Sequence, residues 1–85
     1  MKTFEYTIKD EIGIHARPAG LLVNKAKALG CTVTLEKDGK RADASRLFAV
    51  MGLGVKHGDT LRIILEGGDE DAAARELLAF FEENL

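Results

Sequence analysis

Hydrophobic and polar residues alternate along residues 1–9, 32–37 and 60–66, which predicts three half-buried β-strands. The dipeptide Asp38-Gly39 follows the second of them. This dipeptide is typical of a tight hairpin, because both of its positions tolerate a positive φ. The chain is therefore expected to return over residues 40–44 as a short fourth strand at an edge of the sheet.

Three other segments carry apolar residues at helical spacing. Residues 16–29 predict a helix with Pro18 in its first turn and Gly30 as its stop. Residues 47–53 predict a short helix capped by Ser45. The third helix begins near Asp69, where acidic residues suit the positive end of the helix dipole. Its predicted apolar side consists of Ala73, Leu77, Leu78, Phe80, Phe81 and Leu85.

The element order is thus β-α-β-β-α-β-α in a single domain over residues 1–85. Four strands interleaved with three helices favour an α+β fold, in which an antiparallel sheet carries its helices on one face. With 46% hydrophobic and 31% charged residues, the chain can bury a small core. No run approaches the ~20 apolar residues of a membrane span.

Charge and cysteine content argue against several classes of function. A formal net charge of -2 provides no field that would attract nucleic acid or an anionic membrane. Cys31 is the only cysteine, so no intramolecular disulfide forms, and no residues show the spacing of metal ligands. We therefore expect a cytoplasmic protein with no cofactor, no bound metal, no nucleic-acid partner and no direct membrane insertion.

The segment from Gly13 to Pro18 is the strongest candidate for chemistry. His15 directly precedes a predicted helix, whose first free N–H groups form an anion site reinforced by the helix dipole. Neutral imidazole is a good nucleophile near neutral pH, and Arg17 offers a fork of donors to a phosphate. The pattern predicts that His15 attacks phosphorus, while Arg17 and the backbone of Ala16 and Arg17 hold the resulting dianion. Taken alone, His-x-Arg-Pro is also compatible with a loop histidine beside a solvated arginine.

Four stretches of the chain decide between a phosphoryl site and a loop histidine: Gly13-Ile14-His15-Ala16-Arg17-Pro18-Ala19, Asp38-Gly39-Lys40, Met51-Gly52-Leu53-Gly54-Val55 and Glu66-Gly67-Gly68-Asp69-Glu70. In their order and spacing the whole chain resembles the histidine-containing phosphocarrier (HPr) family of the bacterial phosphoenolpyruvate-dependent sugar phosphotransferase system. The resemblance implies an open-faced β-sandwich and a carrier without independent enzymatic turnover. It also implies that His15 accepts a phosphoryl group on Nδ1 from Enzyme I and passes it to sugar-specific IIA domains, assisted by Arg17.

A second group of candidate residues lies on the short helix. Val50 and Leu53 suit the core side of this helix, whereas Leu47, Phe48 and Met51 lie on other sides. Because the family docks its partners on this surface, we expect an exposed apolar patch there, although apolar residues of short helices are more often core. The expected patch consists of Gly20, Leu21, Leu47, Phe48 and Met51.

Three departures from the family pattern bear on function, one of which is Ala19-Gly20 after the proline, where the family commonly has Ala-Thr or Ala-Ala and partner contact is expected to differ. The regulatory serine of low-GC Gram-positive members aligns with Arg46, so control by a serine kinase is not expected. Many members have a small polar residue at the position of Ile12, whose hydrogen bond this chain lacks. We expect a monomer that makes small, transient contacts with Enzyme I and IIA domains. The alternative is a regulatory paralogue, or a carrier of a nitrogen-linked phosphorelay. His15 and Arg17 would be present in either branch, so they do not distinguish the sugar branch from the alternative.

Overall fold

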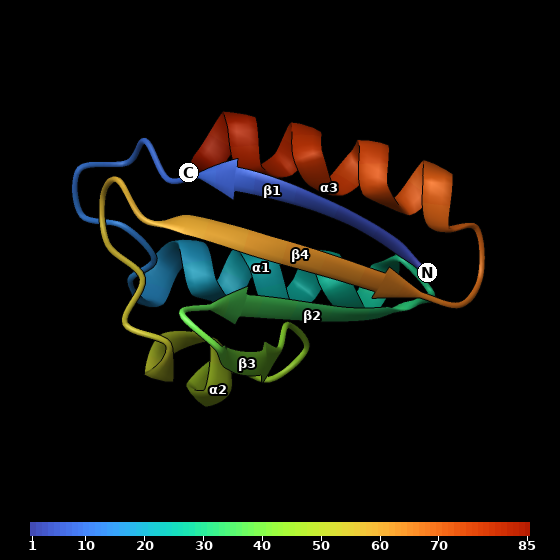
Figure 1. Ribbon diagram of the computed structural model, residues 1–85, viewed down its shortest axis with the longest axis horizontal. Coiled ribbons are helices and arrows are strands. Elements are labelled where there is room, and N and C mark those ends of the chain that lie inside the picture. The colour runs from blue at the N-terminus through green and yellow to red at the C-terminus, as the bar shows by residue number, and fades with distance from the viewer.

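In the computed structural model, which describes residues 1–85, a four-stranded antiparallel sheet is covered by three helices (Figure 1). The strands are β1 (Lys2–Thr7), β2 (Thr32–Lys37), β3 (Lys40–Asp43) and β4 (Thr60–Glu66). The helices are α1 (Ala16–Ala28), α2 (Leu47–Gly52) and α3 (Glu70–Asn84). The order β-α-β-β-α-β-α confirms the predicted α+β architecture.

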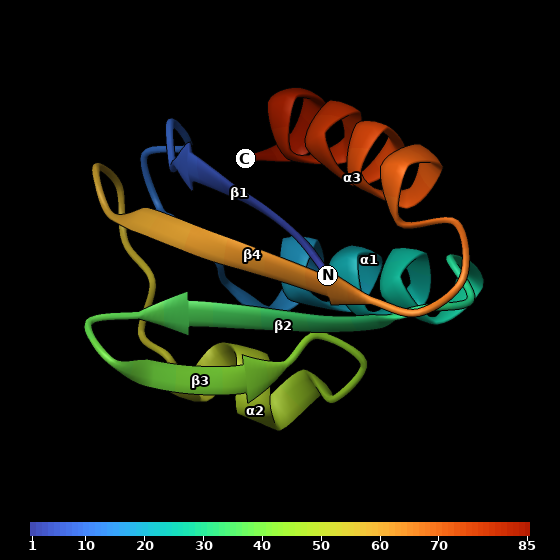
Figure 2. The same ribbon diagram turned by 45° about the vertical axis from the view of Figure 1, so that its right-hand side comes forward.

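The strand order in the sheet is β1-β4-β2-β3, so β4 lies in the interior and β1 and β3 form the edges. All pairs are antiparallel, and Ile63 of β4 lies opposite both Phe4 and Leu35. Helices α1 and α3 pack behind the sheet, and α2 lies beside β3 and the N-terminal part of α1 (Figures 1 and 2). This arrangement brings α2 close to the start of α1.

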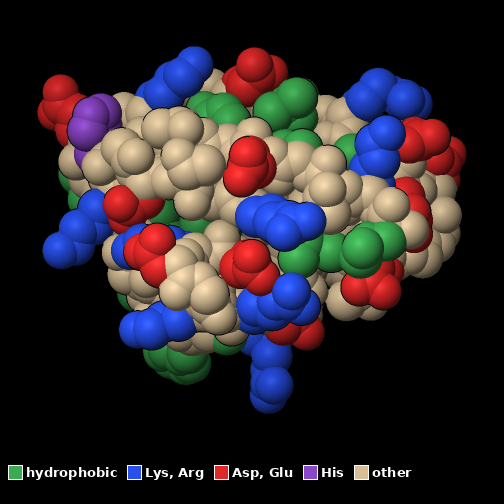
Figure 3. Space-filling model, in the orientation of Figure 1, with side chains coloured by type: hydrophobic (Ala, Val, Ile, Leu, Met, Phe, Trp, Pro, Cys, Tyr) green, Lys and Arg blue, Asp and Glu red, His purple; other side chains and the backbone are tan.

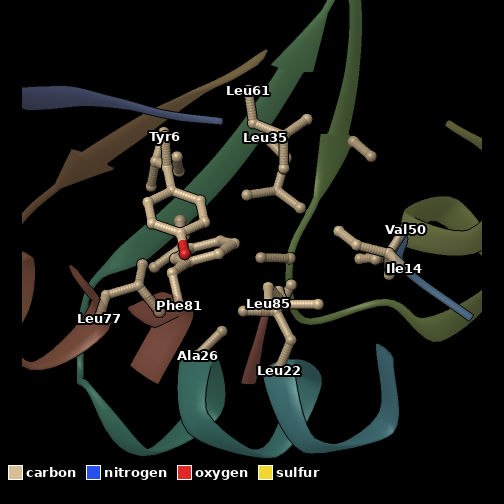
Figure 4. Packing of buried hydrophobic residues seen from close by; sticks show 14 of the residues in the cluster. Tyr6, Ile14, Leu22, Ala26, Leu35, Val50, Leu61, Leu77, Phe81 and Leu85 are labelled. Carbon is tan, nitrogen blue, oxygen red and sulfur yellow. The ribbon is translucent and has the colours of Figure 1, made fainter. Parts of the chain in front are cut away.

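The core fills the space between the sheet and the helices (Figure 4). Leu61, Ile63 and Leu65 alternate along β4 with no exposed surface, as a strand with one face toward the core requires. The ring of Phe81 on α3 packs against Tyr6, with centroids 5.3 Å apart. Burial of each such side chain stabilises the fold by about 1.5–3 kcal/mol.

The opposite face of the sheet is open and carries charges of alternating sign. Glu5, Arg62, Glu36 and Arg41 lie opposite one another across the four strands. Arg41 Nε donates to Glu36 Oε2 at 2.7 Å. Directly opposed unlike charges each contribute about 0.2–1 kcal/mol to the pairing of strands. Basic and acidic side chains are accordingly interspersed on this face (Figure 3), and no large patch of one sign forms there.

The turn at Asp38-Gly39 is confirmed, since both residues have positive φ, 51° and 80°. The predicted Ser45 cap of α2 is wrong. Arg46 is the N-cap residue, and the Ser45 hydroxyl instead donates to Asp43 Oδ1 at 2.7 Å. The same oxygen accepts the Ser45 N–H at 2.9 Å, and the serine hydroxyl holds the pKa of Asp43 below its usual range. A local turn around Asp43 therefore takes the hydroxyl that the cap would need.

Other differences from the predicted elements are small. Strand β1 spans Lys2–Thr7, shorter than the predicted residues 1–9, because the N–H groups of Lys9 and Asp10 leave the ladder and donate to the Leu85 carbonyl. Helices α1 and α2 each end one residue earlier than predicted. Leu78 was expected on the apolar side of α3 but is 37% exposed. None of the helices combines the length and the apolar character that crossing a membrane requires.

Candidate functional site

The backbone before His15 is fixed by a close approach of two loops. Gly13 has a φ of +84°, and a Cβ there would lie 2.4 Å from the Val55 carbonyl oxygen and 2.6 Å from Lys56 Cα. Only glycine fits this position, because both the backbone conformation and the space exclude a side chain. The Ile14 N–H then donates to the Val55 carbonyl at 3.1 Å, and the Ile14 side chain is buried. Together these contacts fix the position of His15 directly before the first residue of α1.

The first turn of α1 is an open anion site. His15 is the N-cap residue, and its carbonyl accepts the Ala19 N–H at 2.9 Å. The N–H groups of Ala16 and Arg17 have no acceptor in the protein, and Pro18 has no N–H to satisfy. The first turn contains no acidic residue, and the His15 side chain makes no capping hydrogen bond. The positive end of the helix dipole therefore faces solvent beside the imidazole.

His15 and Arg17 share a shallow depression of about 220 Å³. Its lining consists of Asp10, His15, Arg17, Pro18, Leu21 and Asn84. The start of α1 thus meets the loop after β1 and the end of α3. Arg17 is exposed and forms no ion pair, so its guanidinium is available to an anion. A phosphoryl group on His15 would find two free N–H groups and this guanidinium within one small surface.

Asp10 and Asn84 are part of this depression, although neither was expected there from the sequence. The Asp10 side chain accepts the Ile12 N–H at 2.9 Å, which holds its carboxylate at the rim. Asn84 Nδ2 donates to the Phe80 carbonyl at 3.0 Å. The Asp-x-Ile turn is a local signal that could have indicated Asp10. Asn84 has no such signal, because it reaches the site only through the packing of α3.

The residues of the expected docking patch lie on the surface. Phe48 is 85% exposed, and Leu21, Leu47 and Met51 are 45%, 37% and 38% exposed. Val50 and Leu53 are buried, as expected for the core side of α2. Leu21 also lines the depression that contains His15, so the patch on α1 and α2 is continuous with the site. At Gly20, a Cβ would meet no atom within 4 Å, which leaves this part of α1 flat and open.

Two other predicted residues lie apart from the depression. His57 is exposed in the turn before β4, where its Nδ1 is 3.2 Å from the Lys9 carbonyl oxygen. Arg46 is exposed at the start of α2 and has no side-chain capping bond. His15 is therefore the only histidine in the depression.

Comparison with known proteins agrees with this geometry. Residues 2–83 match the family model described as the PTS HPr component phosphorylation site. The phosphocarrier protein HPr of Lysinibacillus sphaericus is 39% identical over 83 residues, which are 98% of this chain and 94% of that protein. The solved structure of HPr-C-His from Thermoanaerobacter tengcongensis has a TM-score of 0.93 at 36% identity, and the match covers 99% of this chain and 94% of that one.

A further solved structure is that of Crh, the catabolite repression protein of Bacillus subtilis, which is described as a dimer with a swapped domain. Its TM-score is 0.77 at 35% identity, over 94% of this chain and 92% of that one. The fold and these relatives together place the chain in a class of small phosphocarrier proteins. The chain belongs to the HPr family of the phosphotransferase system. The family and the phosphocarrier role expected from the sequence are thereby confirmed.

Proposed function

We propose that this phosphocarrier accepts a phosphoryl group from Enzyme I on His15 and passes it to sugar-specific IIA domains. The observation that carries the proposal is the position of His15. Its imidazole lies at the uncapped start of α1, in the same depression as the unpaired Arg17. The depression is small and shallow, so the partner proteins would supply the rest of each reaction site.

The transfer is a substitution at phosphorus. A neutral imidazole nitrogen, Nδ1 by analogy with the family, attacks the phosphorus of phosphorylated Enzyme I and forms a P–N bond. The bond to Enzyme I breaks, and its electron pair stays on Enzyme I. The dianion on His15 is then stabilised by the Ala16 and Arg17 N–H groups and by the Arg17 guanidinium. Attack by a IIA nucleophile breaks the P–N bond and returns a neutral imidazole.

The experiment is to incubate the protein with phosphoenolpyruvate and a bacterial Enzyme I and to weigh it by mass spectrometry. We expect one added phosphoryl group, labile to acid and stable to base, as a phosphoramidate is. His15→Ala should abolish the addition, and His57→Ala, which lies outside the depression, should leave it intact. Phosphate on the His15→Ala protein would show that the assignment is wrong.

The exposed patch of Gly20, Leu21, Leu47, Phe48 and Met51 is proposed to dock both partners. Leu47 and Leu78 form a matched pair, since each is 37% exposed and only Leu47 belongs to the patch. Leu47→Ala should weaken transfer from Enzyme I, and Leu78→Ala should not. Phe48→Ala should weaken transfer most, because exposed aromatic anchors carry about 2 kcal/mol or more at interfaces.

Stability provides the control for these variants. Phe48→Ala should change the free energy of unfolding by less than about 1 kcal/mol, whereas truncation of a buried Phe costs about 3–5 kcal/mol. Unchanged transfer kinetics in the Leu47→Ala and Phe48→Ala proteins would eliminate the docking proposal.

We further propose that Arg46 makes the protein insensitive to the serine kinase of Gram-positive relatives. A guanidinium at this position cannot be phosphorylated by that kinase, and it adds positive charge beside the patch. Incubation with the kinase and ATP should leave the protein unmodified, while Arg46→Ser should become a substrate. Phosphate on Ser45 in the unmodified protein, with slower transfer from Enzyme I, would contradict this.

The second candidate is a regulatory paralogue, which the likeness to the catabolite repression protein Crh favours, or a carrier of a nitrogen-linked phosphorelay. Offering the phosphorylated protein sugar-specific and nitrogen-linked IIA domains in parallel distinguishes the branches. We expect faster transfer to a sugar-specific domain.

We also propose that the carrier works as a cytoplasmic monomer, and light scattering at micromolar concentration should give the mass of one chain. A stable dimer would place it closer to the swapped Crh assembly.

A further inference from the structure

Residues 54–59, which join α2 to β4, form the surface on which the loop before His15 rests. The Val55 carbonyl accepts the Ile14 N–H at 3.1 Å. At the other end of the loop, Gly58 N–H donates to the Ile8 carbonyl at 2.9 Å. The loop between β1 and α1 is thus attached to this segment on both sides. The position of His15 therefore depends on the shape of residues 54–59.

Lys37, at the end of β2, holds that shape. Its Nζ donates to the Gly54 carbonyl at 2.9 Å and lies 3.0 Å from Asp59 Oδ2, so one ammonium joins the two ends of the segment. Asp59 Oδ2 also accepts the Lys56 N–H at 2.8 Å. We call this arrangement of Lys37 and Asp59 the Lys37–Asp59 clasp.

The clasp differs from the other ion pairs of the molecule. The Lys37 and Asp59 side chains are 19% and 31% exposed, whereas each other pair has at least one side chain more than half exposed. Partial burial strengthens the attraction, because water screens the charges less. The Lys56 N–H, followed by Lys37, holds the pKa of Asp59 below its usual range, so this carboxylate is ionised at neutral pH.

We propose that Lys37 and Asp59 are positioning residues for phosphoryl transfer at His15. They keep residues 54–59 in the shape that receives Gly13 and Ile14, and those two residues set where His15 stands relative to the open start of α1. The inference rests on the proposed function of His15. It also links the docking helix to the site, because only the C-cap residue Leu53 separates residues 54–59 from α2.

A structural ion pair and a positioning pair predict different results. Loss of a purely structural pair would lower stability and leave the reaction of the folded protein unchanged. Loss of a positioning pair should lower the maximal rate of transfer, because a displacement of about 1 Å at a reacting group can cost ~100-fold in rate. Docking should change little, since none of the hydrogen bonds and the ion pair of Lys37 and Asp59 involves a patch residue.

The test compares Lys37→Met, which keeps the apolar stem, with Lys37→Arg, which keeps the charge. Arg41→Met is the matched control, since it breaks the Arg41–Glu36 pair on the same hairpin, away from residues 54–59. For each folded variant, the maximal rate of transfer from phosphorylated Enzyme I and the half-saturating concentration are measured separately. Hydrogen exchange of the Ile14 N–H, followed by NMR without any phosphorylation, reports the loop itself.

We expect Lys37→Met to lower the maximal rate about ten-fold, to change the half-saturating concentration less than about three-fold, and to accelerate Ile14 exchange. Lys37→Arg should restore most of the rate, and Arg41→Met should behave as the unmodified protein. Asp59→Asn, which keeps an acceptor for the Lys56 N–H, should reproduce Lys37→Met if that variant folds poorly.

An unchanged maximal rate in Lys37→Met, whatever its Ile14 exchange, would overturn the positioning role while leaving the proposed function intact. An equal loss in Arg41→Met would also overturn it, as a general effect of the hairpin. If the unmodified protein accepts no phosphoryl group, the proposed function fails, and the positioning role fails with it.

Discussion

The starts of α1 and α3 differ in how their first backbone N–H groups, which have no acceptor within the helix, are satisfied. At α3, the Asp69 side chain accepts the Ala72 N–H at 3.1 Å, and Glu70 and Asp71 place negative charge in the first turn. At α1, no side chain caps the helix and no acidic residue lies in the first turn. An N–H group at one helix start is satisfied within the protein, and the first N–H groups at the other have no acceptor.

This difference has a cost in stability that the rest of α1 must offset. A side-chain cap contributes about 0.5–2 kcal/mol, and a favourable charge in the first turn adds about 0.3–1 kcal/mol. Pro18 organises the first turn of α1, and Ala19 and Leu22 are fully buried against the core. Packing thus holds α1 in place while its first N–H groups stay free. Such an exception to local helix rules is expected at a functional site.

The largest effect should come from removing the guanidinium at the open helix start. Arg17→Gln should slow phosphorylation of His15 about ten- to hundred-fold, since hydrogen bonds to charged groups contribute about 1.5–3 kcal/mol. Arg75→Gln, on the exposed side of α3, should leave the rate unchanged. Rates of transfer from phosphorylated Enzyme I measure this. Equal rates for Arg17→Gln and the unmodified protein would remove Arg17 from the site.

The next largest effect should come from giving the start of α1 an acidic residue like those at the start of α3. Ala16→Asp should raise the free energy of unfolding by about 0.3–1 kcal/mol through the dipole. The same carboxylate should slow phosphorylation about ten-fold, because it repels the incoming dianion at effective dielectric constants near 20. Ala16→Asn, which has a similar shape and no charge, is the control. An Asp variant that accepts phosphate at the normal rate would contradict the open-site account.

The capped helix start should respond in the opposite way. Asp69→Ala should lower the free energy of unfolding by about 1 kcal/mol and leave phosphorylation unchanged. Asp69→Asn keeps an oxygen for the Ala72 N–H and should retain most of the stability. Urea titrations of the three proteins measure the difference. A loss of phosphorylation in Asp69→Ala would mean that the two helix starts are not independent.

The smallest effect concerns pH. Hydrogen bonds from the Met1 amino group and the Gly67 N–H hold the pKa of Glu70 below its usual range. Its stabilising contribution is therefore complete above the unfolded-state pKa, about 4.3, and is lost as the pH falls through the lower folded-state value. Glu70→Gln should flatten the acid side of the stability curve, as urea midpoints at several pH values would show. An unchanged curve would rule out a contribution from Glu70.

Much of this contrast could be predicted from local sequence. The bounds of β2 and β4, the Asp38-Gly39 turn and the acidic start of α3 follow from alternation, turn preference and the dipole. His15 and Arg17 were candidates because both lie within three residues of the helix start, and the family resemblance favoured phosphoryl chemistry over a loop histidine beside a solvated arginine. The exposure of Leu47, Phe48 and Met51 was expected from the family resemblance together with the helix periodicity.

What could not be predicted depends on tertiary contact or on competition between short polar side chains. Asn84 joins the depression through the packing of α3, and Lys37 meets Asp59 across a long stretch of chain. Ser45 was expected to cap α2, but the nearby Asp43 carboxylate is a stronger acceptor for its hydroxyl and its N–H. Local patterns do not rank such competing partners.

The most direct test of the open helix start is ¹H–¹⁵N NMR of the protein before and after phosphorylation by Enzyme I and phosphoenolpyruvate. A phosphoryl group held at the start of α1 should move the Ala16 and Arg17 N–H signals strongly downfield, because both would become donors to a dianion. The Ala72 N–H signal, already bonded to Asp69, should stay in place. Phosphorylation of His15 that leaves the Ala16 and Arg17 signals unmoved would contradict the account.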